Sequence, residues 1–523
     1  MSDAPLHINT DTFRQGHGPK FLLFNFLYLC LLMGWTVTLP PLGRDYQWLE
    51  TTPVHAGAGP VVLLRAMQSW LGGFAPAYHL TALLLLWVCM LLVFFLTRLA
   101  TRGPWWLGSV AAVLFMAQPV KAEAALHLTG AALELAPAAA ALAAMLVYAL
   151  DRANPEKNLR MAGLPLCCVL SVLFAGCAPL AFLPFFWERF IVQRPERNWR
   201  VPLLYGLMAL PGFLLHLMAY MAVDFQHIVS AAAAAVFLAY PIGLLPETAA
   251  RLAAHPVPAA ALFACVLAAA VWFARRLAHP ALSFGLCAAA VSGLAVFHRH
   301  LGGFDPVTLE GGGRLTLAAA FFGIAAAGLF HRMAHNPRWR RTAVWSSAGL
   351  CVLFMLLHGV VNLSWLTAGR MVREFQQNAH ALAAEHPDSN FALAPDIGRA
   401  GRAPLEFAES VRYDTPFSRR LPVMVVAVCD IESLAARVRV THYDGKRVAF
   451  EVLQPYPPRP GKDSEATLET PAPRPPRTRL LELRPRIFYA PERAWSLTYT
   501  PFRAEFPEIR LVLPLERPAE ISE

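Results

Sequence analysis

The chain has 523 residues, is 56% hydrophobic and only 15% charged, and carries nine cysteines and a formal net charge of +10. Soluble domains are usually about a quarter charged, so this composition excludes an ordinary soluble protein and predicts an integral membrane protein. Eight of the nine cysteines lie in apolar stretches, which excludes a disulfide framework. The arginines cluster in short loops between apolar runs, a distribution that reports membrane orientation and argues against nucleic acid as a partner.

Apolar runs dominate the first two thirds of the chain. Residues 1–20 are polar and predict a cytoplasmic tail, and the run from Phe21 to about Leu39 predicts a first transmembrane helix because it lacks a cleavage site. Ten further runs follow, most near the roughly 20 residues that span hydrocarbon. They start close to Tyr78, Trp105, Gly130, Met161, Ala178, Val201, Val257, Ala281, Leu315 and Ala343. Residues 21–362 are therefore predicted to be an α-helical polytopic membrane domain with about 11 transmembrane helices.

The arginine-rich loops set the predicted orientation. They follow the second, fourth and sixth runs and mark two later turns, and the positive-inside rule puts all of them on the cytoplasmic side. The N-terminus then lies inside, and the part after the last run lies outside. The apolar stretch Ile228 to Leu245 does not fit this count as a full span. We interpret it as a re-entrant or interfacial segment on the outer face, interrupted by Pro241.

The composition changes to that of a soluble domain from about Thr367. Ala368 to Glu385 favours an amphipathic helix, and short β-like runs follow. Two of these runs flank Asp444-Gly445, a dipeptide typical of a β-hairpin. The segment Gln454 to Arg477 is rich in proline and predicts an exposed, extended loop. Residues 363–523 are therefore predicted to form a soluble α/β domain on the outer face.

Four ionisable residues interrupt the apolar sequence between Ala117 and Leu150. They are Lys121, Glu123, His127 and Glu134, which fall within fourteen residues. Ionisable groups at membrane depth cost several kcal/mol unless they face a wet cavity or a partner. The segment is therefore a candidate site, or the wall of one.

The predicted topology brings three charged loops to the outer face. They carry Arg44 and Asp45, then Lys121, Glu123 and His127, and finally Arg314. A carboxylate beside cations suits the activation of a hydroxyl against a phosphate-linked leaving group, because the carboxylate takes the proton and the cations hold the phosphate. Charged residues in short outer loops are also often simply solvated. For Glu123 and Glu134, which sit nearer the hydrocarbon, a functional or buried structural role is as strongly expected as a solvated one.

In this order the features resemble a bacterial polytopic glycosyltransferase of the GT-C fold, in the group related to protein O-mannosyltransferases and their tetratricopeptide-bearing relatives. The resemblance covers roughly residues 20 to 405. It is carried by GRDYQWLETTP in the first loop, PAYHLTALLLLW (Pro76 to Trp87), QPVKAEAALHLTGAALELA (Gln118 to Ala136), FLAYPIGLLP and GGRLTLAA.

The resemblance implies a GT-C-like arrangement in the bacterial inner membrane, with a periplasmic C-terminal domain. It implies a polyprenyl-phosphate-linked sugar as donor and a protein or glycan as acceptor. Asp45 would be the base for the acceptor hydroxyl, and Arg314, Arg44 and Lys121 would bind the donor phosphate. Glu123, His127 and Glu134 would line the cavity. No cofactor and no metal ligands are predicted, although a divalent metal is compatible with this chemistry.

Several positions depart from the family pattern. Ala175-Gly176-Cys177 stands at a Ser-Lys-Glu position, Ala131 stands where an arginine is expected, and Gly313 stands where an acid precedes the arginine. Loss of phosphate-binding cations should cost donor or transition-state binding. The alternative is a catalytically degenerate relative that serves as a membrane scaffold or a subunit of a larger complex, with a protein partner bound through the C-terminal domain.

Overall fold

The computed structural model describes residues 17–42, 45, 57–72, 74–219, 279–293 and 309–385, short strands between residues 391 and 512, and isolated positions among the rest. The chain divides into two compact units. The first comprises Met1–Leu39 with Gln47–Ser364, and the second comprises Pro40–Tyr46 with Trp365–Glu523. The apolar helices belong to the first unit and the strands to the second.

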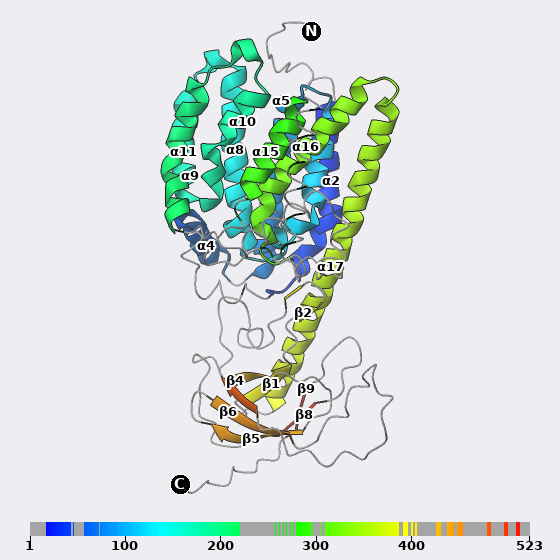
Figure 1. Cartoon of the computed structure of the whole chain (residues 1–523). Helices are drawn as coiled ribbons and strands as arrows, with labels where there is room; N and C mark the ends of the chain where they lie inside the picture. Colours follow the sequence, from blue (N-terminus) through cyan, green and yellow to red (C-terminus); the bar gives the residue numbers. More distant parts are fainter. Residues whose placement is uncertain are drawn as a thin grey trace. The chain divides into compact units, whose positions relative to one another are not determined.

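Six helical segments of the described chain are long and apolar enough to cross a membrane, and a seventh results if one bent pair counts as a single span. The six are Pro19–Thr38 (α2, His17–Met33, with η1, Gly34–Thr38), Ala75–Thr101 (α5), Ala131–Ala153 (η4, Ala131–Leu135, with α8, Ala136–Ala153), Arg200–Met218 (within α11, Arg200–Ala219), Gly312–His335 (η10, Gly312–Leu315, with α16, Thr316–His335) and Arg340–Arg370 (within α17, Arg340–Glu385). The bent pair joins α6 (Trp105–Ala117) to Pro119–Leu126. These helices make the chain a helical membrane protein (Figure 1).

Three of the predicted runs form shorter helices. α9 (Arg160–Leu173) and α15 (Pro280–Gly293) have 14 residues each, and α10 (Leu183–Phe190) has 8 residues after the 3-10 turn η6 (Ala175–Ala181). The run that starts at Val257 lies mostly outside the described residues, and the stretch Ile228 to Leu245 lies wholly outside them. The total of eleven spans therefore stays a prediction.

The loop after the first span contains a helix that the apolar runs do not predict, α4 (Ala58–Leu71). Its Leu64 and Met67 are buried, whereas Val62 and Trp70 are 66% and 87% exposed. A helix of 14 residues is too short to cross hydrocarbon. The loop is thus partly helical, with one buried and one exposed apolar face.

Glycines allow close approach between α15 and α16, which lie side by side (Figure 1). A Cβ added to Gly285 would lie 2.5 Å from the backbone nitrogen of Ala325, and one added to Gly328 would lie 2.6 Å from that of Leu282. Gly323 makes a similar approach to the backbone of α6. Lipid is as apolar as the helices are, so membrane helices associate through close packing rather than through hydrophobic burial.

Arginine-bearing loops meet at one end of the first unit. Arg102 after α5, Arg152 in the last turn of α8 and Glu196 before α11 line one pocket there. Gly103 lies beside His331 of α16, since an added Cβ would be 3.3 Å from the imidazole ring. The positive-inside rule expects arginine-bearing loops to cluster at one end of the helices in this way. The side of the membrane that this end faces stays a prediction.

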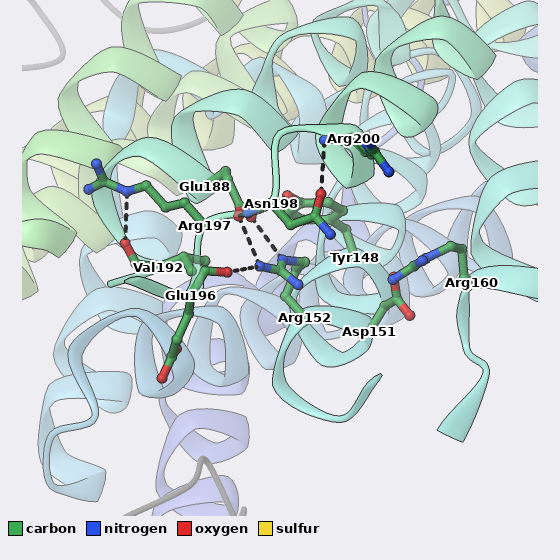
Figure 2. A network of polar contacts seen from close by, with 10 residues as sticks. All are labelled: Tyr148, Asp151, Arg152, Arg160, Glu188, Val192, Glu196, Arg197, Asn198 and Arg200. Atoms are coloured by element: carbon green, nitrogen blue, oxygen red, sulfur yellow. Dashed lines mark hydrogen bonds and ion pairs between the residues drawn. The ribbon is translucent and has the colours of Figure 1, made fainter. Parts of the chain in front are cut away.

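A buried carboxylate ties α8 to α10 at the same end (Figure 2). Glu188 is fully buried and accepts hydrogen bonds from Arg152 Nε at 2.8 Å and from Arg152 Nη2 at 2.9 Å. The Tyr148 hydroxyl donates to it at 3.2 Å and the Asn198 backbone N–H at 2.6 Å. Because a buried carboxylate is costly unless it is paired and fully hydrogen-bonded, these donors offset the cost of burying Glu188.

Helix α17 is continuous from Arg340 to Glu385, so the last predicted span and the predicted amphipathic helix Ala368 to Glu385 are one element. Within the first unit, two of its polar side chains bind the end of α2. His358 Nε2 lies 3.1 Å from Met33 Sδ, and Asn362 Nδ2 donates to the Leu32 carbonyl at 3.0 Å. Their i,i+4 spacing places both on one face of α17.

The described strands of the second unit form three small sheets. The strands are β1 (Phe391–Pro395), β2 (Arg399–Ala400), β3 (Ala403–Pro404), β4 (Val425–Cys429), β5 (Arg437–Tyr443), β6 (Arg447–Val452), β7 (Arg479–Glu482), β8 (Ser496–Tyr499) and β9 (Ile509–Val512). β1 pairs with β4 in parallel, β2 pairs with β3, and a five-stranded antiparallel sheet has the order β7-β6-β5-β8-β9. The two runs that flank Asp444-Gly445 form β5 and β6. The proline-rich segment Gln454 to Arg477 lies outside the described residues.

We predict that Gly212→Ala destabilises the protein by about 1–3 kcal/mol. Gly212 of α11 packs directly on the backbone of α9, where a Cβ would collide with the Ser171 carbonyl. Gly349→Ala is the matched control, because Gly349 is exposed on α17 and nothing lies within 4 Å of the added Cβ. The control should leave stability unchanged or raise it by up to about 1 kcal/mol. Thermal unfolding of the detergent-solubilised variants measures both, and equal Tm values would contradict the close contact between α9 and α11.

Candidate functional site

The ionisable stretch near residues 118–135 lies at a break in a helix. α6 ends at Ala117, and Gln118 is extended, as expected of a residue that precedes a proline. The 3-10 turn η3 (Pro119–Lys121) and the single α-turn α7 (Glu123–Leu126) follow, at 49° to α6. The break brings backbone groups and ionisable side chains together in a buried part of the first unit, because Lys121, Glu123 and His127 are all nearly inaccessible.

The Glu123 carboxylate is held by backbone donors. Its Oε2 accepts a hydrogen bond from the Gly311 N–H at 2.8 Å and a long one from the Gly313 N–H at 3.5 Å. Its Oε1 lies 3.3 Å from Nε2 of His127. Gly311 has a φ of 79°, a left-handed conformation that glycine adopts without strain. Two segments far apart in the sequence therefore meet around one carboxylate.

The glycine turn, Gly311–Gly313, leaves no room for side chains. A Cβ on Gly312 would collide with the Val120 carbonyl, and a Cβ on Gly313 would collide with the carboxylate of Glu134. The acid that approaches the Gly313 backbone comes from another segment, and its position explains why only glycine fits here.

Glu134 lies on a π-helix, η4 (Ala131–Leu135), which leads into α8. Pro137 follows in the first turn of α8. Proline lacks an N–H and its ring clashes with the carbonyl four residues earlier, so a wider turn before it relieves the conflict. π-Turns occur frequently at functional sites, and this one directs a half-buried carboxylate toward the glycine turn.

Lys121 has different neighbours from the acids. Its ammonium donates a hydrogen bond to the Met116 carbonyl at 3.2 Å and lies 4.8 Å from the centre of the Phe115 ring. Cys89 and His358 are within electrostatic reach of it. The Lys121 side chain is about 1% exposed, and in the described part of the chain no carboxylate forms an ion pair with it. A buried ammonium without a counter-ion is costly and is the strongest electrostatic anomaly of the break.

Asp45 belongs to the second unit and Arg44 lies outside the described residues. Asp45 is buried, and its Oδ2 accepts a hydrogen bond from the Leu42 N–H at 3.1 Å. The carboxylate thus closes a tight turn within its own short segment. Its role as a base stays a prediction.

The sequence-predicted residues of the first unit separate into two groups. Glu123, His127 and Glu134 gather at the glycine turn next to Arg314, since η10 contacts η3, α7 and η4. Lys121 shares the break but makes no hydrogen bond or ion pair with that group within the described residues. The glycine turn and His358 were not among the predicted site residues. A triple glycine, and a polar pair four residues apart inside an apolar run, are the sequence signals that point to them.

These features define a helical membrane protein whose broken helix buries ionisable side chains against a glycine turn. Among the described residues, no group of three His, Cys, Asp or Glu side chains is placed to hold a metal ion. In comparisons with known proteins, no family model and no curated protein matches the chain.

We predict that Gly313→Ala destabilises the protein and that Glu134→Ala partly rescues it. The methyl group would occupy space filled by the Glu134 carboxylate, and removal of that carboxylate should make room. A double-mutant cycle should therefore give a coupling energy of roughly 0.5–3 kcal/mol. Gly293→Ala, where nothing lies within 4 Å of the added Cβ, is the control. Strictly additive changes in thermal stability would show that the two residues do not pack together.

Proposed function

We propose that the protein is a membrane glycosyltransferase with a GT-C-like arrangement. It transfers a sugar from a polyprenyl-phosphate donor to a protein or glycan acceptor on the outer face of the bacterial inner membrane. Eleven spans, a cytoplasmic N-terminus and a periplasmic domain over residues 363–523 belong to this proposal. It is supported by the order of family-like segments in the sequence and by the helical membrane fold that carries them.

The observation that carries the proposal is the buried ammonium of Lys121. The neighbouring acids are engaged elsewhere, because Glu123 accepts hydrogen bonds from the glycine turn and lies beside His127, while Glu134 packs on Gly313. Within the described residues, the Lys121 amine at the break therefore has no carboxylate partner. A phosphate is the natural complement of such a charge, since it gains charge-assisted hydrogen bonds in a region of low dielectric.

The proposed reaction is a single displacement at the anomeric carbon of the donor sugar. Asp45 accepts the proton of the acceptor hydroxyl, whose oxygen then forms the new bond to that carbon. The bond from the anomeric carbon to the phosphate oxygen breaks, and polyprenyl phosphate leaves with the electron pair. Lys121, Arg314 and Arg44 stabilise the negative charge that grows on the leaving phosphate. Glu123, His127 and Glu134 shape the cavity around the donor.

A non-catalytic scaffold is the second candidate, favoured by the packing of the acids. Glu123 and Glu134 are used to close the glycine turn around the broken helix, which is a structural task. Such a protein would hold a stable partner, through the domain that follows the last span, and would tolerate changes at Asp45.

We predict that Asp45→Asn, Arg314→Ala and Lys121→Met each abolish a detectable glycan product. Loss of a general base typically lowers the rate by about 10²–10⁴, and loss of one charge-stabilising donor lowers it by about 10²–10³. Mass spectrometry of glycans from cells that carry only the variant measures the product. Lys121→Met keeps the apolar stem and removes a buried charge, so its Tm should not fall.

Lys157→Met is the matched control, because Lys157 is exposed in the turn between α8 and α9. It should leave the glycan product at the parental level. Intact glycosylation in both Asp45→Asn and Arg314→Ala would end the catalytic proposal. A partner that co-purifies equally with the parent and all of these variants would then support the scaffold.

A further inference from the structure

An open pocket lies where α5 and α8 end. It has about 350 Å³ of space, part of it open solvent. Its wall combines the guanidinium-bearing Arg102 and Arg152 with the acidic Glu196 and the apolar Leu99, Trp187 and Ile191. The carboxylate of Glu188 already neutralises Arg152 in a bidentate pair (Figure 2). Arg102 is therefore the cation of this pocket whose charge no carboxylate of the described chain neutralises.

Arg102 occupies a backbone conformation that does not suit arginine. It is the C-cap of α5, with a φ of 50° and a ψ of 24°, where glycine or asparagine is the usual residue. Its side chain is exposed and, within the described chain, makes no hydrogen bond or ion pair. Arg98, one turn earlier, binds the Gly103 carbonyl and covers the Trp105 ring instead. The fold itself thus gives no reason for a guanidinium at position 102.

The chain around the pocket has an excess of positive charge. The segment from Arg189 at the end of α10 to Arg200 at the start of α11 contains four arginines and a single acid, Glu196. The other two arginines are Arg194 and Arg197. The Arg197 side chain donates to the backbone carbonyl of Val192 at 3.2 Å (Figure 2). It also donates to the backbone carbonyl of Arg189 at 2.6 Å. Partial burial and the positive charges of Arg189 and Arg194 lower the pKa of Arg197. An anion bound here would relieve this repulsion.

We propose that this pocket binds the phosphate headgroup of an anionic phospholipid, with Arg102 as the phosphate ligand and the apolar wall against the first acyl-chain carbons. Two helices long enough to cross a bilayer end at the pocket, so it lies at headgroup depth. Basic pockets between membrane helices bind anionic headgroups. The apolar lining favours an amphiphile over a soluble anion.

The site is independent of the glycosyltransferase proposal. The 13-residue helix α6, about 20 Å long, starts just after Arg102 and ends just before the broken segment that carries Lys121 and Glu123. Loss of lipid binding and loss of the glycan product would therefore be separate results.

The test uses the full-length protein in a neutral detergent. Native mass spectrometry measures its affinity for phosphatidylglycerol, with phosphatidylcholine as the zwitterionic reference. Arg102→Gly removes the guanidinium and suits the left-handed backbone, so its Tm should equal or exceed that of the parent. We expect its affinity for phosphatidylglycerol to fall about fivefold, the effect of removing one basic residue from such a site. Arg338→Gly, which removes the same charge from the exposed turn between α16 and α17, should bind like the parent.

Three results would overturn the proposal. Unchanged affinity in Arg102→Gly would remove Arg102 from the site, and an equal loss in Arg338→Gly would indicate general electrostatic attraction. Glycerophosphoglycerol has the same headgroup without acyl chains. If it binds as tightly as the lipid, or if inorganic phosphate displaces the lipid at millimolar concentration, the ligand is a soluble anion.

Discussion

A carboxylate among membrane helices needs hydrogen-bond donors, and in this protein the backbone of the glycine turn supplies them to Glu123. An intact helix uses its own N–H groups, so free donors exist only where helices begin or break. The break after α6 and the turn before α16 therefore form together, because the first supplies the carboxylate and the second supplies its hydrogen-bond donors. Glycine is required in the turn because Val120 and Glu134 approach it too closely for any side chain. The path of the chain between α6 and α8, and the start of α16, follow from this one satisfied charge.

The same constraint explains why Lys121 stands apart. Glu123 accepts hydrogen bonds from the backbone and lies beside His127, and Glu134 packs on Gly313. Within the described residues, the Lys121 ammonium instead donates to one backbone carbonyl and lies over an aromatic ring. A backbone carbonyl neutralises a cation less than a carboxylate does, so Lys121 is the less well compensated group although acids lie close by in the sequence. This asymmetry is the basis of the proposal that an anionic ligand binds at the break. The same packing of the acids also suits a purely structural role, so the catalytic and the scaffold proposals are compatible with the same geometry.

The sequence predicts the long apolar helices well because their length and composition are local properties. Predicted starts at Tyr78, Trp105 and Val201 fall within three residues of the observed helices. Proline in Gln118-Pro119 also signals the end of α6. The helix α4 escapes prediction because it is short and buries only one face. The glycine turn escapes because its glycines are explained by contacts with residues nearly two hundred positions earlier.

Charged side chains are stabilised in different ways at the two polar ends of the first unit. At the break, the ionisable side chains are nearly inaccessible to water. Backbone donors or a rigid turn must therefore hold these side chains in place of water. At the arginine-rich end, Glu188 is satisfied by side-chain donors from α8 together with the Asn198 N–H, and the surplus arginines reach solvent or carbonyls. Arg102, in its left-handed turn, is tolerated at the arginine-rich end because an exposed guanidinium there stays hydrated or contacts lipid headgroups. The position of each charge along the helices therefore decides whether it must be held by backbone, by a partner side chain or by the surroundings of the protein.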